Sequence, residues 1–153
     1  MAVNPNVDFV AGAILTAAQQ NRFGRGVMAY NQVIVSDSSV TAEEVQITGS
    51  AFTAVANRYY RITYLEPFVY GSVTSTYTFR IRQTNLAGTL LQEIATVAGV
   101  LGSYGYGACS VVTTFPAGST NVVATLTSSA GTGVASRTAT RVAYLMVEDI
   151  GPA

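Results

Sequence analysis

Carboxylates and tyrosines are the side chains of this sequence that could take part in chemistry. The 153 residues contain no histidine and no lysine, so the commonest general base and metal ligand and the Schiff-base nucleophile are absent. Glu43 and Glu44 are adjacent, as are Glu148 and Asp149, and neighbours in a strand point to opposite faces of a sheet. Neither pair fits a shared acid–base site. We therefore expect no enzymatic activity, no catalytic residue, no metal site and no cofactor.

Two alternatives remain open for these carboxylates. A glycosidase uses two carboxyl groups, and Glu66 could meet one of the acidic pairs through the fold, although nothing close to it in the sequence supports this. Calcium takes oxygen ligands, which Glu148, Asp149 and nearby loop carbonyls could supply. Both alternatives depend on contacts that only the folded chain can show.

The tyrosines are better candidates for binding than for catalysis. Tyr59 and Arg61 lie in one alternating segment, and Tyr104 and Tyr106 are interleaved with glycines in the segment 102–107. Tyrosine and arginine are enriched at the centres of protein interfaces, and a tyrosine ring presents an apolar body with a polar tip that also suits a sugar. We favour the core or a subunit interface over a ligand site. The predicted surface or subunit contacts are Tyr59, Arg61, Tyr104 and Tyr106.

Composition and charge narrow the choice of partners. Charged residues make up 10% of the chain and the formal net charge is zero, whereas a typical globular chain is about a quarter charged. Such a surface suits a protein that lives in an assembly, and it gives no electrostatic reason to expect nucleic acid as a partner. The first residues lack the pattern of a signal peptide, and no stretch approaches the ~18 apolar residues of a membrane span. We therefore expect synthesis in the cytoplasm and no membrane insertion.

The chain from residue 27 onward reads as a series of β-strands. Apolar and polar residues alternate with a period of two, most cleanly in the segment 76–82, and turn-forming residues separate the segments. Strands recur about every ten residues, which favours an antiparallel β-sandwich of jelly-roll or Greek-key type with about eight to nine strands. Cys109, the only cysteine, is expected to be a small buried side chain in a strand. The predicted strand segments are 27–35, 44–48, 51–55, 59–64, 76–82, 90–97, 109–115, 122–127 and 141–148.

The first part of the chain reads differently, and we divide the protein into an N-terminal anchoring arm at 1–26 and a β-sandwich domain at 27–153. Thr16 and Gln19 have the spacing of a capping box, which predicts one or two helical turns over 17–21. A helix this short is not stable alone in water. We expect the arm to be mobile in the free protein and ordered on a partner. The apolar residues that could anchor it are Phe9, Val10, Ile14 and Leu15.

Three segments resemble small β-sandwich virion proteins of tailed phages that infect actinobacteria. Residues 8–21 resemble a segment near the start of these proteins, which reads Phe-x-x-Gly-x-x-Leu-Thr-Ala-x-x-Met/Gln-Asn. Residues 52–61 look like a strand–turn–strand of their β domain, and residues 145–152 resemble their end. This family comprises minor tail, fibre and head-decoration proteins, and the resemblance carries over no catalytic residue.

The resemblance and the composition together predict a non-enzymatic virion structural protein, either a minor tail protein or a capsid decoration protein. Its expected location is the virion and its expected partners are other virion proteins. We also expect a homo-oligomer, with a trimer as the best single guess. The alternative is a carbohydrate-binding or receptor-binding module that uses the tyrosines to recognise a glycan of the host cell envelope.

Overall fold

The computed structural model describes residues 14, 17–21 and 23–153 of the chain. Within these residues it has twelve β-strands and a single helical turn. The helix and the first six strands are α1 (Ala17–Gln20), β1 (Gly26–Val33), β2 (Asp37–Val40), β3 (Glu44–Thr48), β4 (Phe52–Ala54), β5 (Arg58–Gly71) and β6 (Ser75–Gln83). The remaining strands are β7 (Leu90–Ala98), β8 (Gly105–Thr113), β9 (Gly118–Thr120), β10 (Val122–Ser128), β11 (Gly133–Ala135) and β12 (Ala143–Pro152).

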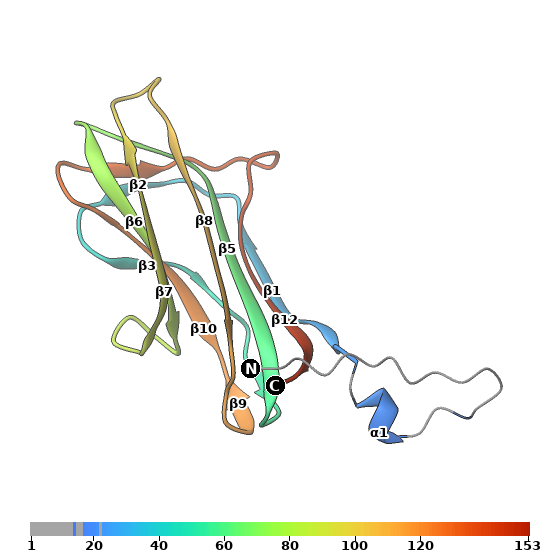
Figure 1. Ribbon diagram of the computed structural model, residues 1–153. Helices are drawn as coiled ribbons and strands as arrows, with labels where there is room; N and C mark the ends of the chain where they lie inside the picture. The colour runs from blue at the N-terminus through green and yellow to red at the C-terminus, as the bar shows by residue number, and fades with distance from the viewer. Residues whose placement is uncertain (1–13, 15–16, 22) are drawn as a thin grey trace.

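Two antiparallel sheets pack face to face as a β-sandwich (Figure 1). In the first, sheet A, β1 pairs with β12, β12 with β5 and β5 with β8; the short β11 pairs with β5 beyond the end of β12, and β2 pairs with β11. The second, sheet B, has the order β3-β10-β6-β7. The orders β1-β12-β5-β8 and β3-β10-β6-β7 are those of a jelly roll. The predicted all-β antiparallel sandwich is therefore confirmed.

The number of strands differs from the expected eight to nine. Each of the nine predicted segments contains a strand, but β2, β9 and β11 lie between the predicted segments. These three strands have three or four residues each, which is too short for an alternating pattern to be recognised. The strand β5 is also longer than predicted. It continues past Pro67 because a bulge between Glu66 and Val69 accommodates a residue that cannot donate to the ladder.

The core lies between the inner faces of the two sheets and includes three tyrosines. The side chains of Tyr60, Tyr64 and Tyr77 are fully buried, as is Phe79. The sheets approach closely at Gly107, where an added Cβ would lie 2.5 Å from the ring of Phe79. Tyr60 and Tyr64, which lie on the inner face of β5, therefore fill the core.

Cys109 is also fully buried, as predicted for a small side chain in a strand. Burial raises the pKa of its thiol to about 11, so the thiol stays protonated at neutral pH.

The sandwich has two distinct ends. The C-terminus and α1 lie at one end, which we call the proximal end, and the β7–β8 loop lies at the opposite, distal end (Figure 1). The helix is one turn long, and Ile14, which precedes it, is 91% exposed. Of the other predicted anchoring residues, Phe9, Val10 and Leu15 lie outside the described residues. Gly26, which we assigned to the arm, is the first residue of β1.

No helix in the described part of the chain has the length and hydropathy needed to cross a membrane.

Candidate functional site

A buried ion pair occupies the space between the sheets near the distal end. Arg137 donates from Nε and Nη2 to the two carboxylate oxygens of Glu66, over 2.9 Å and 2.6 Å, and the hydroxyl of Tyr64 donates to the same carboxylate. Glu66 is fully buried and Arg137 is 5% exposed. Both oxygens of Glu66 are thus engaged by protein donors, which is the environment of a structural ion pair rather than of an accessible catalytic acid.

Hydrogen bonds extend this ion pair toward β2 and β3. Arg137 donates to Oε1 of Gln46, and Nε2 of Gln46 donates to Asp37 and Glu44. Burial alone would raise the pKa of Asp37, but hydrogen bonds from the Ser39 backbone N–H, Gln46 and the Ser39 hydroxyl outweigh it. Together they lower the pKa from 3.8 to about 2. The folded protein therefore holds Asp37 ionised in acid.

We expect this carboxylate to make folding sensitive to acid. Because the pKa of Asp37 is about 2 in the folded protein and 3.8 as its ordinary value, the stabilisation is complete above about pH 4 and is lost as the pH falls toward 2. The variant Asp37→Asn should lose less stability over that window than the parent protein. Urea unfolding at closely spaced pH values measures this, with Glu93→Gln as a control outside the network. An equally steep loss in Asp37→Asn would assign the acid sensitivity to other carboxylates.

Glu148 and Asp149 lie on opposite faces of β12, as their spacing predicted, whereas Glu43 precedes β3. Glu148 pairs with Arg61 on the outer face of sheet A, and Asp149 pairs with Arg58 inside the sandwich. Glu43 pairs instead with Arg82 on the outer face of sheet B. Among the described residues, no three His, Cys, Asp or Glu side chains are close enough to hold a metal ion together.

A second buried ion pair joins the sandwich to the root of the arm. Arg58 donates from Nε and Nη2 to the carboxylate of Asp149, over 2.6 Å and 2.7 Å. The same guanidinium donates to the backbone carbonyls of Asn21 and Phe23, just after α1. Gly24 lies so close to β12 that an added Cβ would be 2.7 Å from the Asp149 carbonyl oxygen. We call this contact the arm clasp, and nothing in the local sequence around Arg58 predicted it.

The outer face of sheet A is rich in apolar and aromatic side chains. In the pairing registers, Tyr30 is opposite Met146, and Tyr144 is opposite Leu65. The rings of Tyr30 and Tyr144 stack with their centroids 5.9 Å apart. The four long strands of this sheet carry a single outward-facing charged pair, Arg61 with Glu148. Further apolar residues that this sheet exposes are Val27, Val112 and Ile150.

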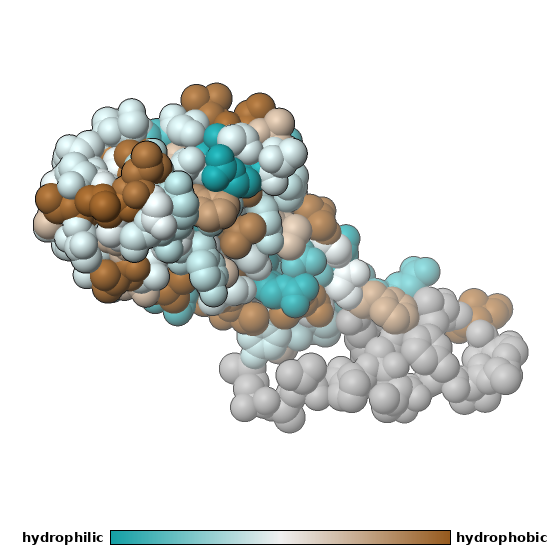
Figure 2. Space-filling model, turned by 90° about the horizontal axis from the view of Figure 1, so that it is seen from above, coloured by the Kyte–Doolittle hydropathy of each residue, from teal (hydrophilic) through white to brown (hydrophobic). Residues whose placement is uncertain are grey.

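The four predicted contact residues all belong to β5 and β8 or the residue before β8. Arg61 is exposed and Tyr59 is half-buried at the proximal half of sheet A, whereas Tyr104 and Tyr106 lie at the distal end. The structure therefore does not bring the four into one site. Figure 2 views the molecule from above and shows brown apolar residues scattered among pale ones, with few teal residues.

At the distal end Tyr104 belongs to an aromatic group that the sequence did not indicate. The rings of Phe68 and Tyr70 both meet the Tyr104 ring edge-on, with centroids 5.3 Å and 5.6 Å away. The guanidinium carbon of Arg141 lies 4.9 Å from the centroid of the Phe68 ring. Phe68 lies within the bulge in β5 and Tyr70 follows it, and Arg141 closes the turn between β11 and β12 through a bridge to Thr138. We call Phe68, Tyr70, Tyr104 and Arg141 the distal cluster.

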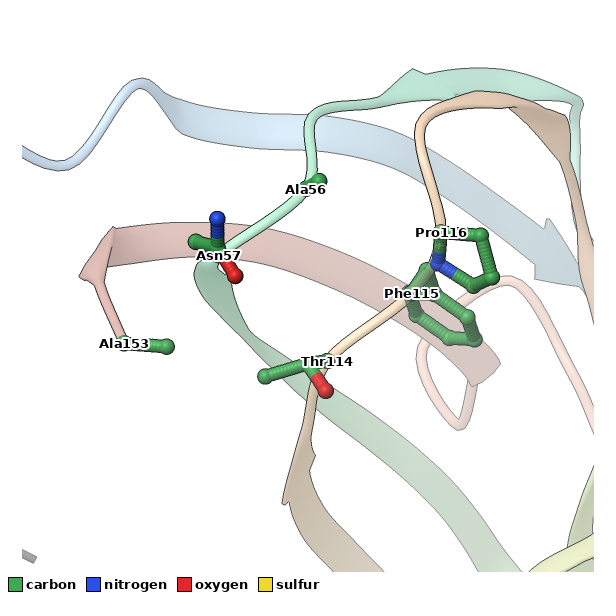
Figure 3. A pocket seen from close by; sticks show the side chains of 6 residues that line it. All are labelled: Ala56, Asn57, Thr114, Phe115, Pro116 and Ala153. Carbon is green, nitrogen blue, oxygen red and sulfur yellow. The ribbon is translucent and has the colours of Figure 1, made fainter.

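An open pocket of about 560 Å³ lies at the proximal end (Figure 3). The six residues that line it come from the turn before β5, the segment after β8 and the C-terminus: Ala56, Asn57, Thr114, Phe115, Pro116 and Ala153. None of them carries a charged side chain that could perform acid–base chemistry. The pocket therefore adds no catalytic group to the site.

Comparison with known proteins gives likeness of fold only. No protein-family model matches the chain, and no curated protein is significantly similar to it. A Bacillus endospore appendage protein, from disulfide-linked pili, is 12% identical over 83% of this chain and 91% of its own, with a TM-score of 0.43. Eiger TNF from S. frugiperda is 10% identical over 86% and 94%, with a TM-score of 0.45. The CBM22-1 xylan-binding domain from Paenibacillus barcinonensis is 13% identical over 86% and 99%, with a TM-score of 0.32.

Proposed function

We propose that the chain is a non-enzymatic structural protein of a phage virion, a minor tail or capsid decoration protein. It packs on neighbouring virion proteins and displays its jelly roll. The observation that carries the proposal is the outer face of sheet A, which combines apolar and aromatic side chains with a single charged pair. The resemblance of three segments to phage virion proteins supports the same assignment.

The dimensions of this face suit a protein partner. Four strands about 4.8 Å apart and about nine residues long span roughly 19 Å by 30 Å. That area is about 570 Å², roughly 70% of the ~800 Å² that each partner contributes to a standard protein interface. The single charged pair does not prevent burial, because Arg61 donates to Glu148 over 2.9 Å within the same chain. A partner would therefore not have to supply an opposite charge.

Charge is distributed unequally between the two outer faces. On sheet B, Glu43 pairs with both Arg80 and Arg82, and Arg80 also pairs with Glu93. A face with a network of charges is solvated more favourably than a face that presents tyrosine, methionine and leucine. Sheet A is therefore the face that we assign to assembly, and we propose that it also mediates homo-oligomer formation, with a trimer as the expected state.

A charge placed on this face should prevent incorporation into particles. In the variant Met146→Glu a half-buried methionine on β12 becomes a carboxylate that a partner would have to desolvate. The matched control is Val97→Glu, which adds the same charge at a 65% exposed position of β7 in sheet B. Particles are made from a phage genome that carries each variant in place of the parent gene, and mass spectrometry of purified particles gives the copy number. We expect at least a tenfold loss for Met146→Glu and none for the control.

The same variants test self-association by light scattering. We expect the parent protein and Val97→Glu to be oligomeric and Met146→Glu to be monomeric, with unchanged circular dichroism. If the parent protein is absent from purified particles, the virion assignment is wrong. If Met146→Glu enters particles as well as the control does, assembly uses another surface.

The second candidate function is recognition of a glycan on the host envelope. The distal cluster favours it, because Tyr104 is held there between two other rings and is still 47% exposed. A receptor-binding role and a virion role are compatible in one protein, since the distal end lies opposite α1 and the arm clasp (Figure 1).

A further inference from the structure

Arg141 differs from every other arginine that the structure describes. Each of the others has a carboxylate oxygen within 4.0 Å: Arg25 and Arg58 approach Asp149, Arg61 pairs with Glu148, Arg80 and Arg82 pair with Glu43, and Arg137 pairs with Glu66. Among the described residues, the guanidinium of Arg141 has no carboxylate and no hydrogen-bond partner; the backbone N–H of Arg141 donates to Thr138 and its carbonyl accepts from the Thr138 N–H. The part of the chain that the structure describes, which has few charges, thus has one cation that is not neutralised.

This cation lies over the half-buried ring of Phe68, which connects it to exposed tyrosines. Arg141 covers one part of the Phe68 ring, and Phe68 in turn packs edge-on against Tyr104. Tyr104 is 47% exposed and Tyr106, two residues later on the same strand edge, is 67% exposed. Because two perpendicular rings hold Tyr104, its ring is positioned before any ligand arrives, and less conformational entropy is lost on binding.

The unpaired guanidinium and the exposed tyrosine rings together indicate which class of ligand could bind. An unpaired guanidinium binds a carboxylate or a phosphate through two parallel hydrogen bonds. Exposed tyrosine rings bind a flat surface that is apolar on its face and hydroxylated at its edge. A single free cation is too little to hold a polyanion such as DNA, which requires several phosphate contacts. A sugar ring that bears one anionic group satisfies all three conditions.

We propose that the distal cluster binds an anionic saccharide, with Arg141 pairing to its carboxylate or phosphate and the rings of Tyr104 and Tyr106 lying against the sugar. This inference deepens the second candidate function and does not depend on the virion role. Phe68 and Tyr70 are positioning residues, since they hold Arg141 and Tyr104 in place.

Isothermal titration calorimetry of the full chain tests the proposal with defined probes. Trigalacturonic acid supplies sugar carboxylates, glucose 6-phosphate supplies a sugar phosphate, and maltotriose is the neutral control. We expect binding of at least one of the two anionic sugars, and the stronger of the two identifies the anionic group. Maltotriose should bind at least tenfold more weakly.

Variants assign the binding to the cluster. Arg141→Gln should weaken binding of the anionic sugar at least tenfold, and Tyr104→Ala should weaken it by a similar factor. Arg80→Gln is the matched control, because it removes an arginine that already has carboxylate partners and that lies on the outer face of sheet B, away from both proposed surfaces. Circular dichroism and melting curves confirm that each variant is folded. Arg141→Lys provides a second variant, which keeps the positive charge but loses the planar guanidinium. Partial binding by Arg141→Lys would support the pairing geometry.

Several results would overturn the proposal. These are equal affinity for maltotriose, unchanged binding in Arg141→Gln, or no heat of binding for either anionic sugar at millimolar concentration. Tight binding of an acidic peptide, tested as a tri-glutamate, with no response to sugars would reassign the cluster to a protein partner. The particle experiment with Met146→Glu is independent, so failure of one proposal can be distinguished from failure of the other.

Discussion

Replacing Arg137 by methionine should lower the free energy of unfolding by about 3–5 kcal/mol, the cost expected when one partner of a buried ion pair is removed. The variant leaves the carboxylate of Glu66 fully buried with Tyr64 as its remaining donor, and it removes the donor that faces Oε1 of Gln46. Urea unfolding followed by circular dichroism at pH 7 measures the loss.

The double variant Arg137→Met, Glu66→Leu separates the charge effect from the packing effect. Because it removes both charges and leaves apolar side chains in their place, it should recover most of the stability that Arg137→Met loses. A single variant that is as stable as the parent protein would show that water reaches Glu66 and solvates it. A double variant that is no better than the single one would assign the loss to packing rather than to the unpaired carboxylate.

The strands could be predicted from the sequence because each sheet has one buried and one solvated face. In β6 the buried residues Tyr77, Phe79 and Ile81 alternate with half-buried polar residues, and this pattern fixes both the strand and its inner face. The short β2 and β11 could not be predicted in the same way. They pair with each other, and β11 also pairs with the end of β5, so their positions depend on strands that are distant in the sequence.

The buried polar contacts could not be predicted because they join residues that are far apart in the chain. Arg58 and Asp149 are 91 residues apart, and Glu66 and Arg137 are 71 apart. The alternation in β5 places Arg58 in phase with its buried residues and Arg61 out of phase, but it does not indicate which carboxylate meets each guanidinium. Arg137 and Arg141 both lie in the connection between β11 and β12, where no alternation applies.

The tyrosines show which residues of the distal end could be predicted from the sequence. The sequence singled out Tyr104 and Tyr106 from their glycine-rich context, and both are exposed at the distal end. It did not indicate Phe68, Tyr70 or Arg141, because the bulge in β5 and the turn before β12 bring them to Tyr104. The glycines have a separate role, since Gly107 lies on the inner face of β8 against Phe79.

Two deletions should separate anchoring by the arm from stability of the sandwich. Removing residues 2–20 keeps the arm clasp, because Arg58 still meets the carbonyls of Asn21 and Phe23. We expect its unfolding free energy to change by less than about 0.5 kcal/mol, as for other changes away from buried contacts. Removing residues 2–24 takes away both carbonyls, and we expect a loss of about 1.5–3 kcal/mol, the usual contribution of hydrogen bonds to a charged group.

Both deletions should abolish incorporation into particles, since each removes the apolar residues Phe9, Val10, Ile14 and Leu15 that we propose as the anchor.

Gly24→Ala in the full chain provides a further control. Its Cβ would lie 2.7 Å from the Asp149 carbonyl oxygen, so it should loosen the clasp while keeping every anchoring residue. Thermal melts measure the effect of each change on stability. Quantitative mass spectrometry of particles measures its effect on incorporation. If the chain without residues 2–20 fails to fold, the arm is part of the core. If it still enters particles at the normal copy number, attachment does not require the arm, and the outer face of sheet A is the surface that we propose to carry it.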